Sequence, residues 1–212
     1  MISGKIRHSD ASALPGILTV LAIVILLGSL ALGSWNFANQ RAVRNDCIVG
    51  HSRILGVLEA YKAEFQDYPA PAHPDETVTI DGKTFPVGAA MMLYQIMSGD
   101  GTNEISTSSA TGKPSDGNIE NDEPSKLALG LEWFPWKLHD GRWFATDALG
   151  HPFQYQKGGT PDAMNATFDL WSCMGDPDTI GKIDAATKRD PAKTARWIKN
   201  FPIDASLTGE EN

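Results

Sequence analysis

The chain has 212 residues, of which 42% are hydrophobic and 21% are charged, a composition that suits one globular domain and excludes two large ones. Its 26 acidic and 18 basic residues give a net charge of −8, which argues against nucleic acid as a partner because phosphate-binding surfaces depend on Lys and Arg. Acidic side chains suit hard cations such as calcium, although the same charge also serves solubility.

An uncharged, mainly apolar stretch occupies residues 14–33. About 20 helical residues match a hydrocarbon core of about 30 Å, and the stretch exceeds the roughly 7 to 15 apolar residues of a secretory signal peptide. We therefore predict a leader at residues 1–16, followed by a transmembrane helix at residues 17–40. The chain is expected to cross the membrane once, with the leader inside.

Helical periodicity continues beyond this stretch. One face of residues 41–65 carries side chains three and four positions apart that can pack in a core. They are Cys47, His51, Ile54, Leu58, Tyr61 and Phe65. No strong helix breaker separates the two patterns, so residues 41–68 are predicted to continue the same helix as an amphipathic segment, giving about 50 residues and about 75 Å in all. His51 is interpreted as a packed residue of that face.

The next segment has the pattern of a hairpin followed by a helix. Residues 77–80 alternate as a strand, the Asp-Gly pair at 81–82 is a strong hairpin turn signal, and residues 83–87 form the return strand. The apolar run at residues 88–97 predicts a short buried helix that stops near Gly99.

Later segments are shorter and bounded by Gly and Pro. We expect an exposed loop at residues 102–122, an extended segment at 127–135, and strand-forming aromatic runs at 143–144, 153–155 and 168–171.

The predicted elements combine into an α+β fold. The amphipathic face of the helix has to be covered, and a small antiparallel β-sheet of three or four strands is a suitable partner in a domain of this size. Residues 69–183 are therefore assigned to one globular domain packed on the helix. Residues 184–212 form a C-terminal tail with a helical turn or two packed by Trp197.

Several segments resemble type IV pilins and the pseudopilins of type II secretion systems. The leader ends at Gly16 before an apolar helix that starts at Ile17, and the amphipathic helix leads into a Tyr-Pro pair at 68–69. Residues 147–155, Asp-Ala-Leu-Gly-His-Pro-Phe-Gln-Tyr, are similar to the family hairpin Asp-Pro-Trp-Gly-Asn-Pro-Tyr-Tyr. Residues 168–178 then follow, in which the strand ends in a Ser, Gly and Asp turn as in the major pseudopilin.

The resemblance implies a pilin-like fold and a structural, non-catalytic role in a filament or a type II secretion pseudopilus. Its implied partners are other copies of the chain, other pilin-like subunits and the bacterial inner membrane, with a periplasmic C-terminal domain. In that family a peptidase cleaves after the glycine, here between Gly16 and Ile17. The glutamate that family members carry shortly after the cleavage point is replaced by Leu21.

The resemblance also implies a calcium loop. Its carboxylates would be Asp176, Asp178 and Asp184, and because calcium takes 6 to 8 oxygen ligands, carbonyl groups near Leu170 and Ser172 would complete the set. The alternative is a solvated Asp-Pro turn in which Asp binds its own backbone.

Two further alternatives stay open on the residues alone. Cys47 and Cys173 could form a disulfide bridge if helix and sheet bring them together, or could be two free thiols. The competing function is an anchored periplasmic enzyme or a carbohydrate-binding module that uses Trp133, Trp136 and Trp143 as stacking platforms. We expect no enzyme, because none of the histidines has metal-ligand spacing and there is no nucleophile elbow.

Overall fold

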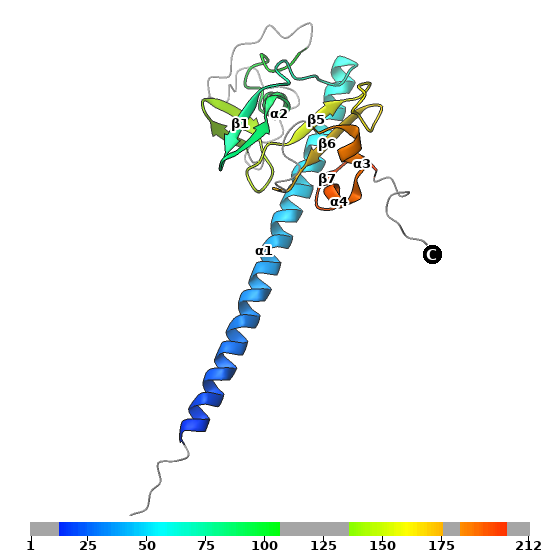
Figure 1. Ribbon diagram of the computed structural model, residues 1–212. Helices are drawn as coiled ribbons and strands as arrows, with labels where there is room; N and C mark the ends of the chain where they lie inside the picture. The colour runs from blue at the N-terminus through cyan, green and yellow to red at the C-terminus, as the bar shows by residue number, and fades with distance from the viewer. Residues whose placement is uncertain (1–12, 107–135, 176–182, 203–212) are drawn as a thin grey trace, which may run out of the picture. The chain divides into compact units, whose positions relative to one another are not determined.

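A computed structural model describes residues 13–106, 136–175 and 183–202, and in its first helix, α1 (Ala13–Phe65), the side chains of residues 13–16 and 30–36 are not described. The chain divides into two compact units, Met1–Ala42 and Val43–Asn212, and each is treated separately. Figure 1 shows the elements coloured in chain order, with α1 running from blue to cyan.

The transmembrane prediction for residues 17–40 is wrong. In the part of the chain that the structure describes, none of the helices combines the length and the apolar character that a membrane crossing requires. The apolar stretch with described side chains, residues 17–29, covers about 20 Å of helix, whereas a hydrocarbon core is about 30 Å thick. The predicted fold with a long N-terminal transmembrane helix is corrected accordingly. The same finding overturns the predicted single-pass location in a bacterial inner membrane with a periplasmic C-terminal domain.

The α+β character with small antiparallel sheets is confirmed. In the second unit one face of α1 is buried, as the periodicity predicts, and carries Cys47, His51, Ile54, Val57, Leu58 and Tyr61. Phe65 was expected on this face but is 49% exposed, because α1 ends at this residue and the chain turns at Gln66 with a φ of 63°.

The first hairpin follows the Asp-Gly signal. Strand β1 (Thr77–Ile80) pairs with β2 (Lys83–Pro86) in the antiparallel sense, with Ile80 opposite Lys83. Asp81 and Gly82 take φ values of 51° and 75°, the left-handed conformation that a two-residue hairpin turn requires.

Helix α2 (Gly88–Ser98) is buried along nearly its whole length. It begins at a glycine because a Cβ on Gly88 would lie 1.9 Å from the carbonyl oxygen of His73, closer than any side chain allows. It ends at Gly99, whose φ of 75° forms a left-handed cap, and the Gly99 amide donates to the Gln95 carbonyl oxygen. The predicted helix and its stop are confirmed.

A second hairpin joins β3 (Trp136–His139) and β4 (Arg142–Ala145) through Asp140 and Gly141, again with positive φ. Only part of it was predicted, at residues 143–144. A three-stranded antiparallel sheet follows, in the order β5-β6-β7, built from β5 (Gln154–Lys157), β6 (Phe168–Ser172) and β7 (Ile198–Lys199). In the described ranges, three small sheets thus take the place of the single predicted sheet.

The C-terminal segment returns to the three-stranded sheet. Helices α3 (Ala185–Arg189) and α4 (Pro191–Thr194) precede β7, and Figure 1 shows these elements in orange and red beside β6. Trp197 is 3% exposed and packs with Trp171 and Phe201. The predicted helical turns packed by Trp197 are confirmed, whereas β7 was not predicted.

Two larger apolar clusters form the core of this unit. One joins the buried face of α1 to α2, β5 and β6, with Phe153 and Leu170 fully buried in it. The other lies between the first hairpin, α2 and Phe144 of β4. The segment around Ile105, expected in an exposed loop, also enters the core, since Ile105 is 6% exposed and pairs with Pro71.

Candidate functional site

The most exposed apolar surface among the described residues lies on α1, and we call residues 17–29 the apolar segment. Its nine large apolar side chains are 51–66% exposed: Ile17, Leu18, Val20, Leu21, Ile23, Val24, Ile25, Leu26 and Leu27. Soluble monomers rarely leave a contiguous apolar patch uncovered unless it is an interaction surface.

The apolar segment is hydrophobic on every side. Successive residues of an α-helix are rotated by about 100°, so the consecutive apolar residues 23–27 alone go round the whole circumference. A helix with one apolar stripe needs one partner, whereas a helix that is apolar all round has to be surrounded. The segment therefore suits the interior of a bundle of helices.

Gly28 lies at the C-terminal end of this surface. A Cβ added to Gly28 would meet no atom within 4 Å, so nothing in the packing of the described residues calls for a glycine there. Glycine in a helix interior nevertheless costs about 1 kcal/mol relative to alanine. The neighbouring Ser29 hydroxyl donates to the Leu26 carbonyl oxygen at 2.8 Å and so needs no water. Small residues at such positions allow close approach of a second helix.

The predicted cleavage point falls at the start of the apolar segment. Gly16 lies within α1, but its exposure is not described. Ile17 is 66% exposed. Cleavage between the two stays a prediction.

The predicted calcium ligands are divided between described and undescribed residues. Asp176 and Asp178 lie outside the described residues. Asp184 caps α3 by accepting from the Thr187 amide at 2.8 Å, which lowers the pKa of its carboxyl. In the described ranges, no group of three His, Cys, Asp or Glu side chains could hold a metal ion. The calcium loop stays a prediction.

The Leu170 carbonyl, one of the two expected backbone ligands, has other partners. The Leu170 carbonyl oxygen accepts from His51 Nε2 at 3.0 Å and from the Asn200 amide at 3.2 Å, which occupies both of its lone pairs. Ser172 is fully buried, and its hydroxyl donates to Asp147 Oδ2 at 2.6 Å.

No disulfide bond joins Cys47 and Cys173 in the structure, which is one of the two alternatives that the sequence left open. Cys47 is buried on α1, and its sulfur accepts from the Ala148 amide at 3.3 Å. Burial raises the pKa of the Cys47 thiol, which keeps it neutral and unreactive. Cys173 is half-buried beside the aromatic cluster of Trp171.

A buried carboxylate organises the turn that resembles the pilin hairpin. Asp147 is 1% exposed, and its Oδ1 accepts from the amides of Leu149 and His151 at 2.9 and 3.0 Å. Its Oδ2 accepts the Ser172 hydroxyl, so this side chain ties the turn to the end of β6. The same turn also contacts α1, because the Ala148 amide donates to Cys47 Sγ.

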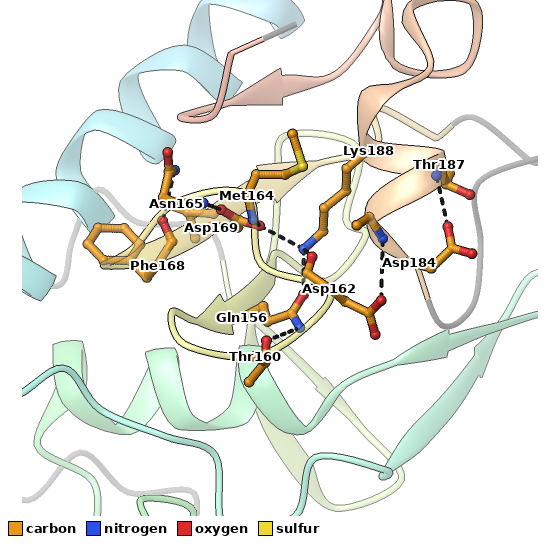
Figure 2. A network of polar contacts seen from close by, with 12 residues as sticks. Gln156, Thr160, Asp162, Met164, Asn165, Phe168, Asp169, Asp184, Thr187 and Lys188 are labelled. Atoms are coloured by element: carbon orange, nitrogen blue, oxygen red, sulfur yellow. Dashed lines mark hydrogen bonds and ion pairs between the residues drawn. The ribbon is translucent and has the colours of Figure 1, made fainter. Parts of the chain in front are cut away.

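A second buried charge was not predicted at all. Lys188 of α3 is 0% exposed, and its Nζ donates to Asp169 Oδ2 at 2.8 Å, to the Asp162 carbonyl oxygen at 2.8 Å, and to Gln156 Oε1. Figure 2 shows Lys188 pointing from α3 toward these acceptors. Each of the three ammonium protons thus has an acceptor. Burial lowers the pKa of Lys188, while the bond to Asp169 and its charge oppose that shift.

Asp169 is equally buried and equally saturated. Its two carboxylate oxygens accept from the amides of Met164 and Asn165 at 2.8 and 2.9 Å, in addition to Lys188 (Figure 2). Nothing in the sequence marks Lys188 as buried, because it stands in a segment rich in Lys and Arg. A fully satisfied ion pair of this kind has a structural role rather than a reactive one.

His51 is buried as predicted and gives the fold a pH dependence. Because a carbonyl oxygen can only accept, His51 Nε2 donates to Leu170, and burial lowers the pKa of His51 while that bond opposes the shift. In the unfolded chain the pKa of His51 is near 6.5, so this state takes up the proton first. The free energy of unfolding therefore falls as pH drops from about 6.5 toward the lower pKa of the folded state, by at most about 1.4 kcal/mol per pH unit.

Urea unfolding at several pH values should show this slope in the parent chain and its loss in His51→Gln. The exposed His73→Gln is the control, and an unchanged slope in His51→Gln would contradict the assignment.

The tryptophans of the competing function are partly packed. Trp136 and Trp143 are half-buried and both contact the Tyr94 ring, edge-on and stacked respectively, with centroids 5.7 Å apart in each pair. Trp133 lies outside the described residues.

Comparison of the chain with protein-family models, with curated proteins and with solved structures gives no match. The resemblance to pilins and pseudopilins therefore depends on the quoted residues alone.

Proposed function

We propose that the chain is a structural, non-catalytic subunit of a pilin-like filament or type II secretion pseudopilus. In this assembly the apolar segment of α1 is buried among the same segments of neighbouring subunits. The observation that carries the proposal is the exposure of large apolar side chains around the whole circumference of the helix.

Other copies of the chain are the occupant that fits this surface best. The segment has to be surrounded, and each copy of the chain brings a helix with the same unmet requirement. Contacts between different faces of identical subunits produce open helical filaments when the rotation does not close into a ring. Gly28 would allow two such helices to approach closely.

The family-like residues support a role in which α1 carries the domain. The Tyr155 hydroxyl donates to the Pro69 carbonyl oxygen at 2.7 Å, and the Tyr68 hydroxyl donates to Glu59 on α1 at 2.9 Å. The hairpin-like turn adds the contact between Ala148 and Cys47. Of the residues that resemble pilin motifs, Tyr68 and Ala148 thus fasten the second unit's chain to its own part of α1, and Tyr155 fastens it to the segment that follows the helix.

The buried charges support a non-catalytic role. Within the described ranges, Lys188, Asp169 and Asp147 have their donors and acceptors engaged by other protein groups. A general acid or base needs a proton that it can exchange with a substrate. These three groups serve packing instead.

Photocrosslinking in cells that produce the full chain tests the assembly. With p-benzoylphenylalanine at Val24, illumination should give a ladder of crosslinked subunits that mass spectrometry identifies as this chain or a pilin-like partner. The same probe at Ala60, an exposed position in the later part of α1, should give no ladder.

A charge in the apolar segment should abolish the ladder. Ile25→Arg places a charge where the assembly buries apolar surface, which costs several kcal/mol and should lower the crosslink yield at least about tenfold. Ala60→Arg is the matched control and should leave the yield unchanged. Equal yields from Val24 and Ala60, or a ladder that persists in Ile25→Arg, would overturn the proposal.

A further inference from the structure

A small hollow lies between α2, β4 and the segment after α2. Its volume is about 80 Å³, and its polar lining includes Gln95 of α2, Asn103, Glu104, and Arg142 and Trp143 of β4. The Arg142 guanidinium pairs with Glu76. The hollow shares no residue with the apolar segment, and none of its residues is used in the proposed assembly.

Two buried polar atoms at this hollow lack a partner. Glu104 Oε2 and the indole Nε1 of Trp143 are shielded from solvent and make no hydrogen bond within the part of the chain that the structure describes. An unsatisfied buried polar group costs about 1–3 kcal/mol, so a native structure that keeps two of them at one hollow calls for an explanation. One atom accepts and the other donates.

The free oxygen of Glu104 is held in place by a closed chain of amides. Asn103 Nδ2 donates to Glu104 Oε1 at 3.0 Å, and Gln95 Nε2 donates to Asn103 Oδ1 at 2.7 Å. Gln95 Oε1 in turn accepts from the Glu104 amide at 2.8 Å. These bonds engage the side-chain amides of Gln95 and Asn103 and leave Oε2 as the Glu104 oxygen without a partner among the described residues.

Aromatic rings line the same place. Tyr94 and Trp143 belong to the lining and stack with an angle of 14° between their rings, and Trp136, which is outside the lining, meets Tyr94 edge-on at 82°. Trp143 thus offers both an aromatic surface and an unpaired N–H. Trp171 and Trp197 also have unpaired indole nitrogens, but they face one another in a packed cluster, and the described residues offer no unpaired acceptor beside them.

The two free atoms select the chemistry of a ligand. A group that bonds both atoms must accept from Trp143 Nε1 and donate to Glu104 Oε2 at once. A hydroxyl does both, whereas an ammonium can only donate and a carboxylate can only accept. The space admits only a few non-hydrogen atoms, since a cavity of about 150 Å³ is needed for benzene. The ligand must therefore insert one hydroxyl-bearing end.

We propose that this hollow is a binding subsite for a neutral pyranose sugar, which inserts one hydroxyl between Glu104 and Trp143. Aromatic faces pack well against the C–H faces of sugars, and a fixed carboxylate and indole N–H supply the directional bonds. The subsite would give a structural subunit a saccharide contact of its own.

Two-dimensional ¹H–¹⁵N spectra of the full chain test the subsite. The six tryptophans give separate indole signals, and Trp143→Phe assigns the one of interest. Titration with methyl glucopyranoside, methyl galactopyranoside and N-acetylglucosamine should reach about 100 mM, because one inserted hydroxyl gives millimolar affinity at best. At least one sugar should shift the Trp143 signal saturably and leave those of Trp171 and Trp197 in place.

Two variants and glycerol test whether the sugar binds specifically at this hollow. Glu104→Gln keeps the size of the side chain, replaces the free acceptor and should weaken the sugar at least about tenfold. Asp140→Asn, an exposed carboxylate outside the lining of this hollow, should bind like the parent. The proposal is overturned if no sugar moves the Trp143 signal, if Glu104→Gln binds equally well, or if glycerol at the same concentration gives the same response.

Discussion

Replacing Lys188 by methionine should lower the free energy of unfolding by about 3 to 5 kcal/mol, the cost of leaving a buried charge without its partner. Methionine fills a similar volume, so the loss comes from Asp169, which stays 0% exposed and loses its ammonium partner. The Gln156 and Asp162 oxygens lose the same donor. The aromatic cluster also loses a cation that lies 4.5 Å from the Trp171 ring centroid.

Urea unfolding of the full chain at neutral pH measures this loss. Lys193→Met is the matched control, because Lys193 is an exposed lysine of α4 in a loose pair with Asp190, and its replacement should cost less than about 0.5 kcal/mol. The double variant Lys188→Met with Asp169→Asn should lose less than the sum of its single variants. A loss below about 1 kcal/mol for Lys188→Met would show that the pair is open to water.

Asp147→Ala should be the second most damaging single change, with a loss of about 3 kcal/mol or more. Alanine leaves the part-buried amides of Leu149 and His151 and the buried Ser172 hydroxyl without their acceptor, at about 1–3 kcal/mol for each group that water cannot reach. The turn should then separate from the end of β6.

Thermal unfolding and hydrogen exchange measure this effect together. Asp147→Asn keeps one acceptor oxygen and should fall between the parent and Asp147→Ala, whereas the exposed Asp75→Ala should stay within about 0.5 kcal/mol of the parent. Exchange of the Leu149 and His151 amides should accelerate in Asp147→Ala. Unchanged protection of these two amides would contradict the role given to Asp147.

Local signals account for the correct part of the predicted fold. The Asp-Gly turn at 81–82 and the stop at Gly99 need only backbone conformations that few residues adopt, so the dipeptide or the glycine predicts them. The same signal stood at Asp140 and Gly141, and would have located β3 and β4 together.

Long-range pairings account for much of the remainder. Lys188 and Asp169 are 19 residues apart, and neither stands in a pattern that distinguishes it from a surface charge. Ala148 and Cys47 are 101 residues apart. Only the folded chain brings such groups together, which is why the sequence predicted the buried face of α1 but not the buried charges beside it.

The apolar character of the candidate site was predicted from the sequence, but the environment that covers it was not. An apolar helix is stabilised in hydrocarbon and among other apolar helices alike, because both environments remove the same apolar surface from water. Composition therefore identified residues 17–29 as a segment to be buried. It did not identify what buries them, and the transmembrane interpretation failed in the described residues.

During synthesis, the hairpins can fold before strand β6 is packed. The reason is that Lys188, Trp197 and Phe201, which pack against β6, come late in the chain. The two hairpins pair residues close in sequence and can form soon after they leave the ribosome. Strand β6 cannot be completed at that point, because Asp169 still lacks its cation and Trp171 still lacks its aromatic partners. The nascent chain must therefore hold an acidic group and an indole ring in contact with water until residue 201 has been made. A pause in translation before that point would prolong the lifetime of an incomplete sheet whose exposed aromatic surface can aggregate.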